Sequence, residues 1–242
     1  MNVLILAAGI PAFQVGGEKF PLFLTEIEGS ILLQKIADQC KGKKDAKLTF
    51  IFNREDVSKY YLSDICRMID EHANVVSMEG TSQGAACTAL YSVIDFDQSE
   101  SLLLINANQF IDLNLSDEIT YFEQSDVDAG LFVFDSTHPR YSYVRINENN
   151  IVIEAAEKRP ISRLANTGIF WFKKTSDFVY AVEQMIRKNA SVDNIFYVTP
   201  ALNELVLISK KILVKEIERA AYHPLKTEKQ LNEFEQSMEH KA

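Results

Sequence analysis

Small and polar residues follow several apolar segments of this sequence, at points where a ligand is commonly bound. Ala8 and Gly9 follow the first apolar segment, and Gln83 and Gly84 precede a helical one. Small residues let a ligand approach backbone N–H groups closely, and N–H groups at the start of a helix attract anions. These segments predict a site for an anionic ligand, although each one alone also fits an ordinary strand-to-helix turn.

Further polar residues occupy equivalent places later in the chain. Asn106 and Asn108 follow another apolar segment, and the charged pair Glu157-Lys158 follows an expected hairpin. Lys19 lies beside two adjacent glycines, Gly16 and Gly17, which permit unusual backbone dihedrals. Lys19 is interpreted either as a phosphate-binding cation or as a solvated surface residue. Glu157-Lys158 is either part of a binding site or a surface ion pair of little energetic value.

The composition excludes several classes of function. The 242 residues carry a net charge of -9, and the longest basic run is residues 41–44, so no nucleic-acid partner is expected. Cys40, Cys66 and Cys87 are scattered without CxxC spacing, which argues against a zinc site or a redox pair. They are predicted to be buried thiols of a protein in a reducing compartment.

No targeting or membrane segment is predicted. The apolar start, residues 3–8, has no basic residues before it and is too short for a secretion signal. No apolar run approaches the roughly 20 residues that a membrane span needs. The sequence therefore predicts a soluble, cytoplasmic protein.

The first half alternates apolar segments with helical periodicity. Strands are predicted at residues 2–7, 48–52, 74–78 and 102–106, and helices at residues 30–39 and 84–93. A further helix, capped by Asn53, is expected to bury four side chains at three- and four-residue spacing, namely Val57, Tyr61, Ile65 and Met68. Such alternation implies a mostly parallel sheet that helices cover on both faces.

The second half has a different order of elements. Strands are predicted at residues 129–134, 168–172 and 212–217, and a hairpin joins residues 141–146 to 151–155. Helices are predicted at residues 176–188, 200–208 and 226–238. Because no linker, repeat or low-complexity segment interrupts the pattern, residues 1–242 are predicted to form one α/β domain. In such sheets ligands bind beyond the carboxyl ends of the strands, so the polar segments are expected to converge on one edge.

Taken together, these segments resemble the sugar-1-phosphate nucleotidyltransferases. The resemblance covers nearly the whole chain and rests on Ile5-Leu6-Ala7-Ala8-Gly9, Phe20-Pro21, Gln83-Gly84-Ala85-Ala86-Cys87-Thr88, Asn106-Ala107-Asn108-Gln109, Ser142-Tyr143-Val144, Ala156-Glu157-Lys158, Pro160-Ile161-Ser162, Thr167-Gly168-Ile169-Phe170 and Phe196-Tyr197-Val198. It implies a Rossmann-like GT-A fold with a mixed, mostly parallel sheet. Within the family, the sequence is most similar to a branch of capsule and lipopolysaccharide gene clusters, often labelled family-2 glycosyltransferase.

The resemblance also implies roles for individual residues. The nucleotide is expected to contact Leu6, Ala8, Gly9, Gln83, Gly84 and Asn106. A phosphorylated sugar or polyol is expected to contact Tyr143, Glu157, Lys158, Asn166 and Gly168. Asn108 and Lys158 are expected catalytic residues. Lys19, which the resemblance does not give, is added to them because its position in the glycine-rich loop would let it supply the positive charge that the family has at position 22.

The sequence departs from the family pattern where the family places charged groups. Residues 10–13, after Gly9, contain no Arg, and Leu22 stands where the family has a Lys. Asn108 replaces an Asp of the metal site, and residues 220–224, where relatives have another Asp, contain no acid. Because Mg²⁺ prefers carboxylate oxygens, Asn108 is a poor ligand and Mg²⁺ is expected to bind weakly. Asp112 is either a displaced metal ligand or a helix or turn cap.

Three functions follow from this combination. The first is a nucleotidyltransferase that acts on a nucleoside triphosphate and a phosphorylated sugar or polyol in surface-polysaccharide synthesis. The second is a glycosyltransferase that uses an activated sugar. The third is a catalytically degenerate nucleotide- or sugar-binding subunit, because each lost electrostatic group commonly costs ~10²–10³ in rate. The sequence leaves open whether the chain forms a homo-oligomer.

Overall fold

A computed structural model describes residues 1–9, 12–15, 18–40, 42–43 and 45–239; for residues 12–15, 18–19 and 239 it describes the backbone alone. Its centre is a nine-stranded sheet. The strands of this sheet are β1 (Asn2–Leu6), β6 (Lys47–Asn53), β7 (Asn74–Met78), β8 (Leu102–Asn106), β10 (Ala129–Asp135), β11 (Ser142–Ile146), β12 (Val152–Glu157), β13 (Leu164–Phe172) and β14 (Ile212–Glu216). Among the described residues, no helix is long and apolar enough to cross a membrane.

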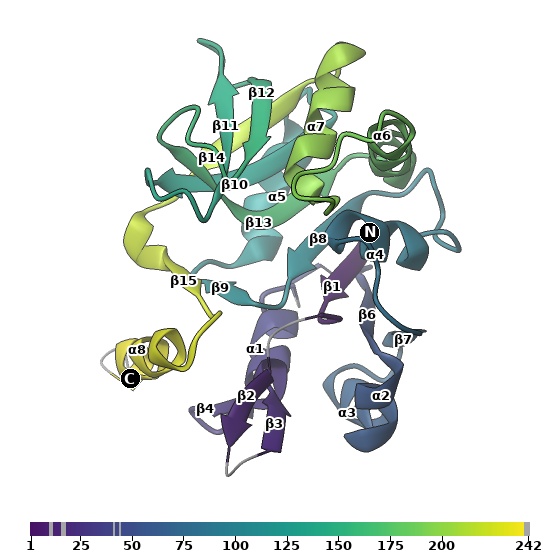
Figure 1. The fold of residues 1–242 in the computed structure, drawn as a ribbon, viewed down its shortest axis with the longest axis vertical. Helices are drawn as coiled ribbons and strands as arrows, with labels where there is room; N and C mark the ends of the chain where they lie inside the picture. Colours follow the sequence, from purple (N-terminus) through teal and green to yellow (C-terminus); the bar gives the residue numbers. More distant parts are fainter. Residues whose placement is uncertain (10–11, 16–17, 41, 44, 240–242) are drawn as a thin grey trace.

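The sheet is mixed and mostly parallel, as predicted. Its strand order is β12-β11-β13-β8-β1-β6-β7, and β10 pairs with both β13 and β14 (Figure 1). The pairs β1–β6, β1–β8, β6–β7 and β10–β14 are parallel. Strand β13 runs antiparallel to β8 and β10, and the predicted hairpin is confirmed by the antiparallel pair β11–β12. Because β13 is reversed, its amino-terminal half lies at the same sheet edge as the carboxyl end of β8.

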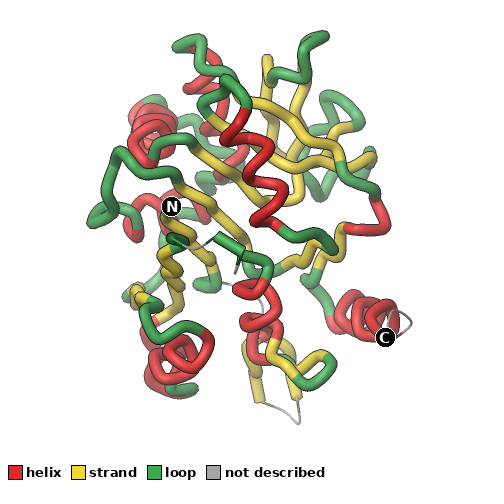
Figure 2. The backbone as a smooth tube through the Cα atoms, turned by 180° about the vertical axis from the view of Figure 1, so that it is seen from behind, coloured by secondary structure: helices red, strands yellow, loops and turns green. Residues whose placement is uncertain are grey.

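Helices cover both faces of the sheet (Figures 1 and 2). One buried cluster contains side chains of α1 (Leu32–Asp38), α3 (Leu62–Ile69), α5 (Leu115–Gln124) and α8 (Glu228–Glu239). The other contains side chains of α4 (Ala85–Ser92), α6 (Thr175–Arg187) and α7 (Val198–Leu207). Along β1, Val3 and Ile5 belong to the first cluster and Leu4 and Leu6 to the second, because successive side chains of a strand point to opposite faces.

Short strands flank the central sheet. Three pairs are formed by β2 (Ala12–Val15) with β3 (Glu18–Pro21), β4 (Glu26–Ile27) with β5 (Ser30–Ile31), and β9 (Gln109–Ile111) with β15 (Tyr222–Pro224). Two 3-10 turns are η1 (Leu22–Leu24) and η2 (Arg219–Ala221). The β9–β15 pair is antiparallel, and it brings the C-terminal part of the chain beside the segment that follows β8.

The single helix expected after Asn53 is in fact two helices, and the prediction of which side chains it buries is partly wrong. Helix α2 (Arg54–Lys59) begins directly after Asn53, but the Asn53 side chain makes no capping hydrogen bond. Tyr61 adopts a left-handed conformation with φ 51° before α3 begins. This break turns the apolar face of α3 so that Leu62 and Cys66 are buried. Tyr61 and Met68 are 72% and 86% exposed instead.

Helix α5 was not predicted, although its start has a clear signal. The Asn114 side chain accepts a hydrogen bond from the backbone N–H of Ser116 at 3.0 Å, and two acids, Asp117 and Glu118, lie in the first turn. Side-chain caps and acidic first turns are typical helix starts. The helix buries Leu115, Ile119 and Phe122.

Candidate functional site

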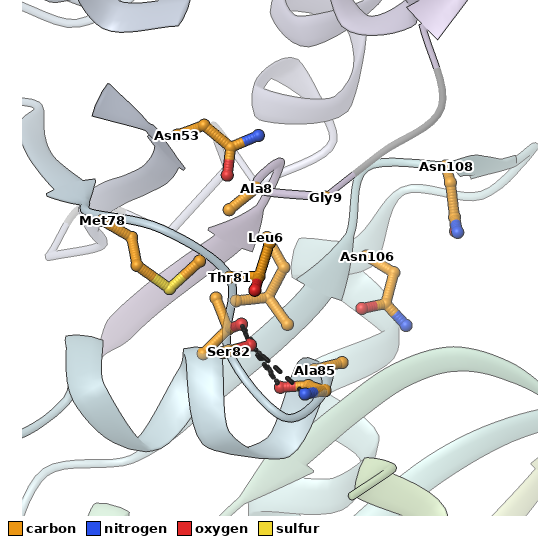
Figure 3. Close-up of a pocket in the computed structure, with 12 residues that line it drawn as sticks. Leu6, Ala8, Gly9, Asn53, Met78, Thr81, Ser82, Ala85, Asn106 and Asn108 are labelled. Carbon is orange, nitrogen blue, oxygen red and sulfur yellow. Dashed lines mark hydrogen bonds between the residues drawn. The ribbon is translucent and has the colours of Figure 1, made fainter. Parts of the chain in front are cut away.

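The first cavity opens beyond the carboxyl ends of β1, β6, β7 and β8 and has a volume of about 310 Å³ (Figure 3). Its lining residues come from these strand ends, the loop after β7 and the first turns of α4, and they are Leu6, Ala8, Gly9, Asn53, Met78, Thr81, Ser82, Gly84, Ala85, Thr88, Asn106 and Asn108. The polar groups that line this cavity are backbone amides, hydroxyls and side-chain amides. None of the described lining residues has an ionised side chain.

The start of α4 is held by local hydrogen bonds. The Ser82 hydroxyl bonds the Thr88 hydroxyl at 2.6 Å and accepts from the Gly84 N–H at 3.3 Å. Gly84 has a φ of 122°, and a Cβ atom there would lie 2.5 Å from the carbonyl oxygen of Phe196. This close approach requires glycine.

The same turn is bonded to the loop before α7. The Phe196 N–H donates to the Gln83 carbonyl at 2.7 Å, and the Phe196 carbonyl accepts from the Ala86 N–H at 3.1 Å. Two of the N–H groups at the start of α4, those of Gly84 and Ala86, therefore have protein partners. The N–H of Ala85, a residue that lines the cavity, has no hydrogen-bond acceptor among the described residues.

A second cavity, of about 190 Å³, adjoins the first. Three residues line both cavities, namely Ala85, Asn106 and Asn108. The other residues of the second cavity are Gln109, Arg140, Tyr141, Ser142, Glu157, Asn166, Thr167, Gly168, Phe170, Tyr197, Val198, Thr199, Tyr222 and Lys226. They come from β9, the turn before β11, the strands β11, β12 and β13, the start of α7 and the segment around β15.

Buried amides form part of the second cavity. Gln109 is 3% exposed, and its Oε1 accepts a hydrogen bond from the Tyr222 hydroxyl at 3.3 Å. Burial raises the pKa of Tyr222, which keeps this hydroxyl protonated as a donor. The Nε2 of Gln109 is buried and has no partner among the described residues. An unsatisfied buried donor is costly, and here it belongs to a residue that lines a cavity.

The β13 backbone fixes a further amide beside Gln109. The Asn166 Nδ2 donates to the Thr199 hydroxyl at 2.9 Å, and the Asn166 Oδ1 accepts from the Gly168 N–H at 2.8 Å. Gly168 has a φ of 86°, and a Cβ there would lie 2.8 Å from Asn106 Nδ2. Glycine at this position therefore lets two side-chain amides lie directly against the strand.

The second cavity contains charged side chains as well. Glu157 accepts a hydrogen bond from the Ser142 hydroxyl, and burial raises the pKa of its carboxyl. Lys226 is solvent-exposed as a whole residue, yet desolvation on the cavity side lowers the pKa of its ammonium. Glu157 opposes that decrease, whereas the charge of Arg140 adds to it. Two cations thus face one carboxylate in this cavity.

Most residues that the sequence predicted do line the cavities. The first cavity contains Leu6, Ala8, Gly9, Gly84, Asn106 and Asn108, and the second contains Glu157, Asn166 and Gly168. The predicted convergence of the strand ends on one edge is thereby seen for these segments.

Four predicted residues have other surroundings. Gln83 is exposed, and Tyr143 is buried with its hydroxyl donating to the His138 carbonyl at 2.7 Å. The ammonium of Lys158 pairs with Asp193 at 3.3 Å and lies 5.2 Å from the centre of the Tyr197 ring. Asp112 lines a separate cavity, together with Asn114 and Met238.

A fifth predicted residue, Lys19, has its backbone in β3. Its side chain lies outside the described residues, so its role as a phosphate-binding cation stays a prediction.

Sequence reasoning gave no role to Arg140, Tyr222 or Lys226. Arg140 follows a proline in the turn between β10 and β11. Tyr222 lies within residues 220–224, the segment that was noted only for its missing acid, and Lys226 follows two residues after its end. A cation this close to a missing metal ligand was the signal that would have identified Lys226.

A magnesium ion, which the resemblance implies, does not fit the residues present. Within the described part of the chain there is no group of three or more His, Cys, Asp or Glu side chains that would hold a metal ion. The only carboxylate among the described lining residues of the two cavities is Glu157, and it shares its cavity with two cations. Mg²⁺ binds proteins mainly through carboxylates and phosphates.

Solved structures of known proteins share this fold. A nucleoside-diphosphate-sugar pyrophosphorylase from Vibrio cholerae is 20% identical, covers 98% of this chain and 100% of its own, and superposes with a TM-score of 0.79. A UDP-glucose pyrophosphorylase complexed with UDP-glucose is 16% identical, with 100% and 99% covered and a TM-score of 0.76. An inositol-1-phosphate CTP transferase from T. maritima is 14% identical, with 98% and 94% covered and a TM-score of 0.74.

At these identities the likeness shows the Rossmann-like nucleotidyltransferase fold. A comparison with curated protein sequences found no match. The profile of the nucleotidyl transferase family, however, matches residues 21–205, which is more than half of the chain and includes most of both cavities. The protein therefore belongs to the nucleotidyl transferase family of transferase enzymes.

Proposed function

We propose that this protein transfers a nucleotidyl group from a nucleoside triphosphate to a phosphorylated sugar or polyol, in the cytoplasm, during the synthesis of a surface polysaccharide. The class of acceptor is supported by the structures of similar fold, which include two pyrophosphorylases of sugar nucleotides and an inositol-1-phosphate CTP transferase. The polysaccharide context rests on the branch of the family that the sequence resembles.

The shared wall of the two cavities is the observation that carries this proposal. The first cavity offers backbone and amide groups to a nucleotide, and the second offers hydroxyls, amides and charges to a phosphorylated polyhydroxy compound. Because Ala85, Asn106 and Asn108 line both, ligands bound in the two cavities meet at these residues. Holding two reactants in contact contributes a large part of the acceleration of a group transfer.

The reaction joins the two ligands at that wall. A phosphate oxygen of the acceptor attacks the α-phosphorus, a new P–O bond forms, and the bond to the bridging oxygen of the β-phosphate breaks. Pyrophosphate takes the electron pair of that bond and leaves. The protein's part in such a transfer is alignment and charge neutralisation. We assign the alignment to Asn108 and the neutralisation to Lys19 and to Lys158, whose ammonium must leave Asp193 to reach the phosphates.

Pyrophosphate release tests the proposal directly. The protein is incubated with each of the common nucleoside triphosphates in combination with a panel of sugar and polyol phosphates. We expect release with one base and one class of acceptor, and a slower rate for Asn108→Leu, which keeps the size of the side chain but removes its polar atoms. Asn149→Leu is the control, because Asn149 lies on an exposed turn. Asn203→Leu is not suitable, because the Asn203 side chain forms hydrogen bonds with the β12 backbone.

A binding subunit without activity is the second candidate, and one observation favours it. Leu22, which stands where the resemblance expects a Lys, is fully buried in η1 and brings no cation to either cavity. Calorimetric titration with nucleotides and nucleotide-sugars separates the two candidates. Binding without pyrophosphate release in any combination would establish the binding subunit, and release in any combination would exclude it.

A further inference from the structure

The metal site that the family resemblance implies is replaced here by uncharged and cationic groups. Asn108 stands at one of the aspartate positions, and residues 220–224 contain no acid. A divalent cation bound at Asn108 would have no carboxylates to balance its charge. It would share the second cavity with Arg140 and Lys226, which would repel it. The phosphates of the substrates nevertheless need neutralisation, so the compensating charge has to come from other groups.

The backbone places Lys226 beside Asn108. Strand β15 pairs with β9 so that Pro224 lies opposite Gln109. One residue further on, the N–H of Leu225 donates to the carbonyl oxygen of Asn108 at 2.8 Å. These backbone contacts fix the start of the Lys226 side chain next to Asn108, one of the three residues that line both cavities.

The surroundings of the Lys226 ammonium suit an anionic ligand. The charges that act on it are Glu157, which attracts it, and Arg140 and Lys158, which repel it. No ion pair of Lys226 is present among the described residues, whereas Lys158 is engaged by Asp193. Desolvation by the cavity wall lowers the pKa of Lys226, and partial desolvation also strengthens the attraction of a cation to an anion. The ammonium is therefore available to a ligand.

A buried donor belongs to the same cavity. Gln109 is 3% exposed, and the Tyr222 hydroxyl occupies its Oε1, which leaves the buried Nε2 without a partner among the described residues. A buried N–H group without a partner is destabilising unless water or a ligand accepts its hydrogen bond. A phosphate oxygen supplies such an acceptor.

We propose that Lys226, together with Arg140 at the exposed rim and the Nε2 of Gln109, binds the phosphate of the acceptor directly and takes the place of the divalent metal in this protein. The identification of the anion as the acceptor's phosphate rests on the function proposed above. The cationic site itself predicts that inorganic phosphate binds to the second cavity in the absence of any divalent ion.

Calorimetric titration with inorganic phosphate, in a buffer containing EDTA, tests this inference on the intact chain. We expect wild-type protein to bind phosphate with the same affinity in EDTA and in Mg²⁺. Lys226→Met keeps most of the side-chain length and removes the charge, and it is expected to weaken binding about tenfold or more, as for a lost charged hydrogen bond. Lys226→Arg, which keeps the charge, is expected to retain most of the affinity.

Lys229→Met is the matched control. Lys229 lies in the first turn of α8, is exposed, and pairs with Glu233 of the same helix rather than with the cavity. Its substitution is expected to leave phosphate affinity unchanged, and thermal unfolding of each variant establishes that it is folded.

Phosphate binding that requires Mg²⁺ would overturn the inference, and so would equal affinities of wild type and Lys226→Met. Both measurements use neither nucleotide nor turnover. A protein that binds phosphate through Lys226 but releases no pyrophosphate therefore disproves only the proposed function, and the reverse result disproves only the role of Lys226.

Discussion

Gly168 is the residue whose backbone most directly sets the geometry of the second cavity. Its φ of 86° is unfavourable for any other residue, and a Cβ there would lie 2.8 Å from Asn106 Nδ2 and 3.0 Å from both polar atoms of the Gln109 amide. The amides of Asn106 and Gln109 occupy the space that a side chain at position 168 would fill.

Gly168→Ala is expected to damage both stability and binding. The left-handed conformation costs an alanine about 1–2 kcal/mol, and the displaced amides weaken binding of phosphate and of phosphorylated sugars. Gly29→Ala is the control, because Gly29 has a φ of 75° but a Cβ atom there would meet nothing within 4 Å among the described residues. Chemical denaturation and calorimetry are the measurements. Equal losses of affinity in both variants would show that strain alone, rather than contact with the amides, explains the effect.

Helix α8 holds the C-terminal segment of the second cavity in place. Its Phe234 is 1% exposed, and the ring centre lies 5.0 Å from that of Phe110 and 4.9 Å from that of His223. Lys226 lies between β15 and this helix, so the packing of Phe234 against His223 restrains the segment that carries Lys226.

Phe234→Ala is therefore expected to lower the free energy of unfolding by about 3–5 kcal/mol, as for other buried phenylalanines, and to weaken phosphate binding. Phe178→Ala provides a comparison of similar size, because Phe178 is fully buried in α6, in the other core cluster. Under conditions where both variants are folded, calorimetry should show weaker phosphate binding only for Phe234→Ala. Unchanged phosphate affinity in that variant would mean that Lys226 is positioned without α8.

The two cavities differ in how far the sequence predicts them. The first is built from residues that directly follow strands, and for these residues the rule that ligands bind at strand ends was sufficient. The second depends on the β9–β15 pair, which joins Ile111 to Tyr222. No local pattern indicates which distant segment completes a sheet edge, so Tyr222 and Lys226 were missed. The error at Tyr61 and Met68 is of another kind, since one left-handed residue changed the face of a helix whose spacing looked continuous.

At the scale of the whole molecule, three thiols report on the packing of the sheet and its helices. Cys40 and Cys66 are buried in the core cluster that contains α1 and α3, as the sequence predicted, and burial raises the pKa of each to about 12. Cys87, on α4, is only half-buried, and its pKa is raised as well. Thiolates are the reactive species, and a raised pKa keeps all three cysteines protonated. The three thiols therefore differ mainly in how accessible they are to a reagent.

A thiol-reactive disulfide reagent should therefore modify Cys87 in the native protein and all three cysteines after unfolding. Cys87→Ser removes the native reaction and provides the control. The appearance of the other two thiols along a denaturant titration should coincide with the loss of circular dichroism. Rapid native modification of Cys40 or Cys66 would contradict the packing described for the first cluster.

The wall formed by Ala85, Asn106 and Asn108 has a consequence for inhibition and for the turnover rate. A single molecule that spans both cavities loses its translational and rotational freedom only once. After one part of the molecule has bound in its cavity, the other part binds at a high effective concentration. The product of the proposed reaction is such a molecule, because nucleotide and sugar are joined through the phosphates at this wall. We therefore expect the product to be held more tightly than either substrate, its departure to limit the rate of the cycle, and non-hydrolysable linked analogues to be the strongest inhibitors.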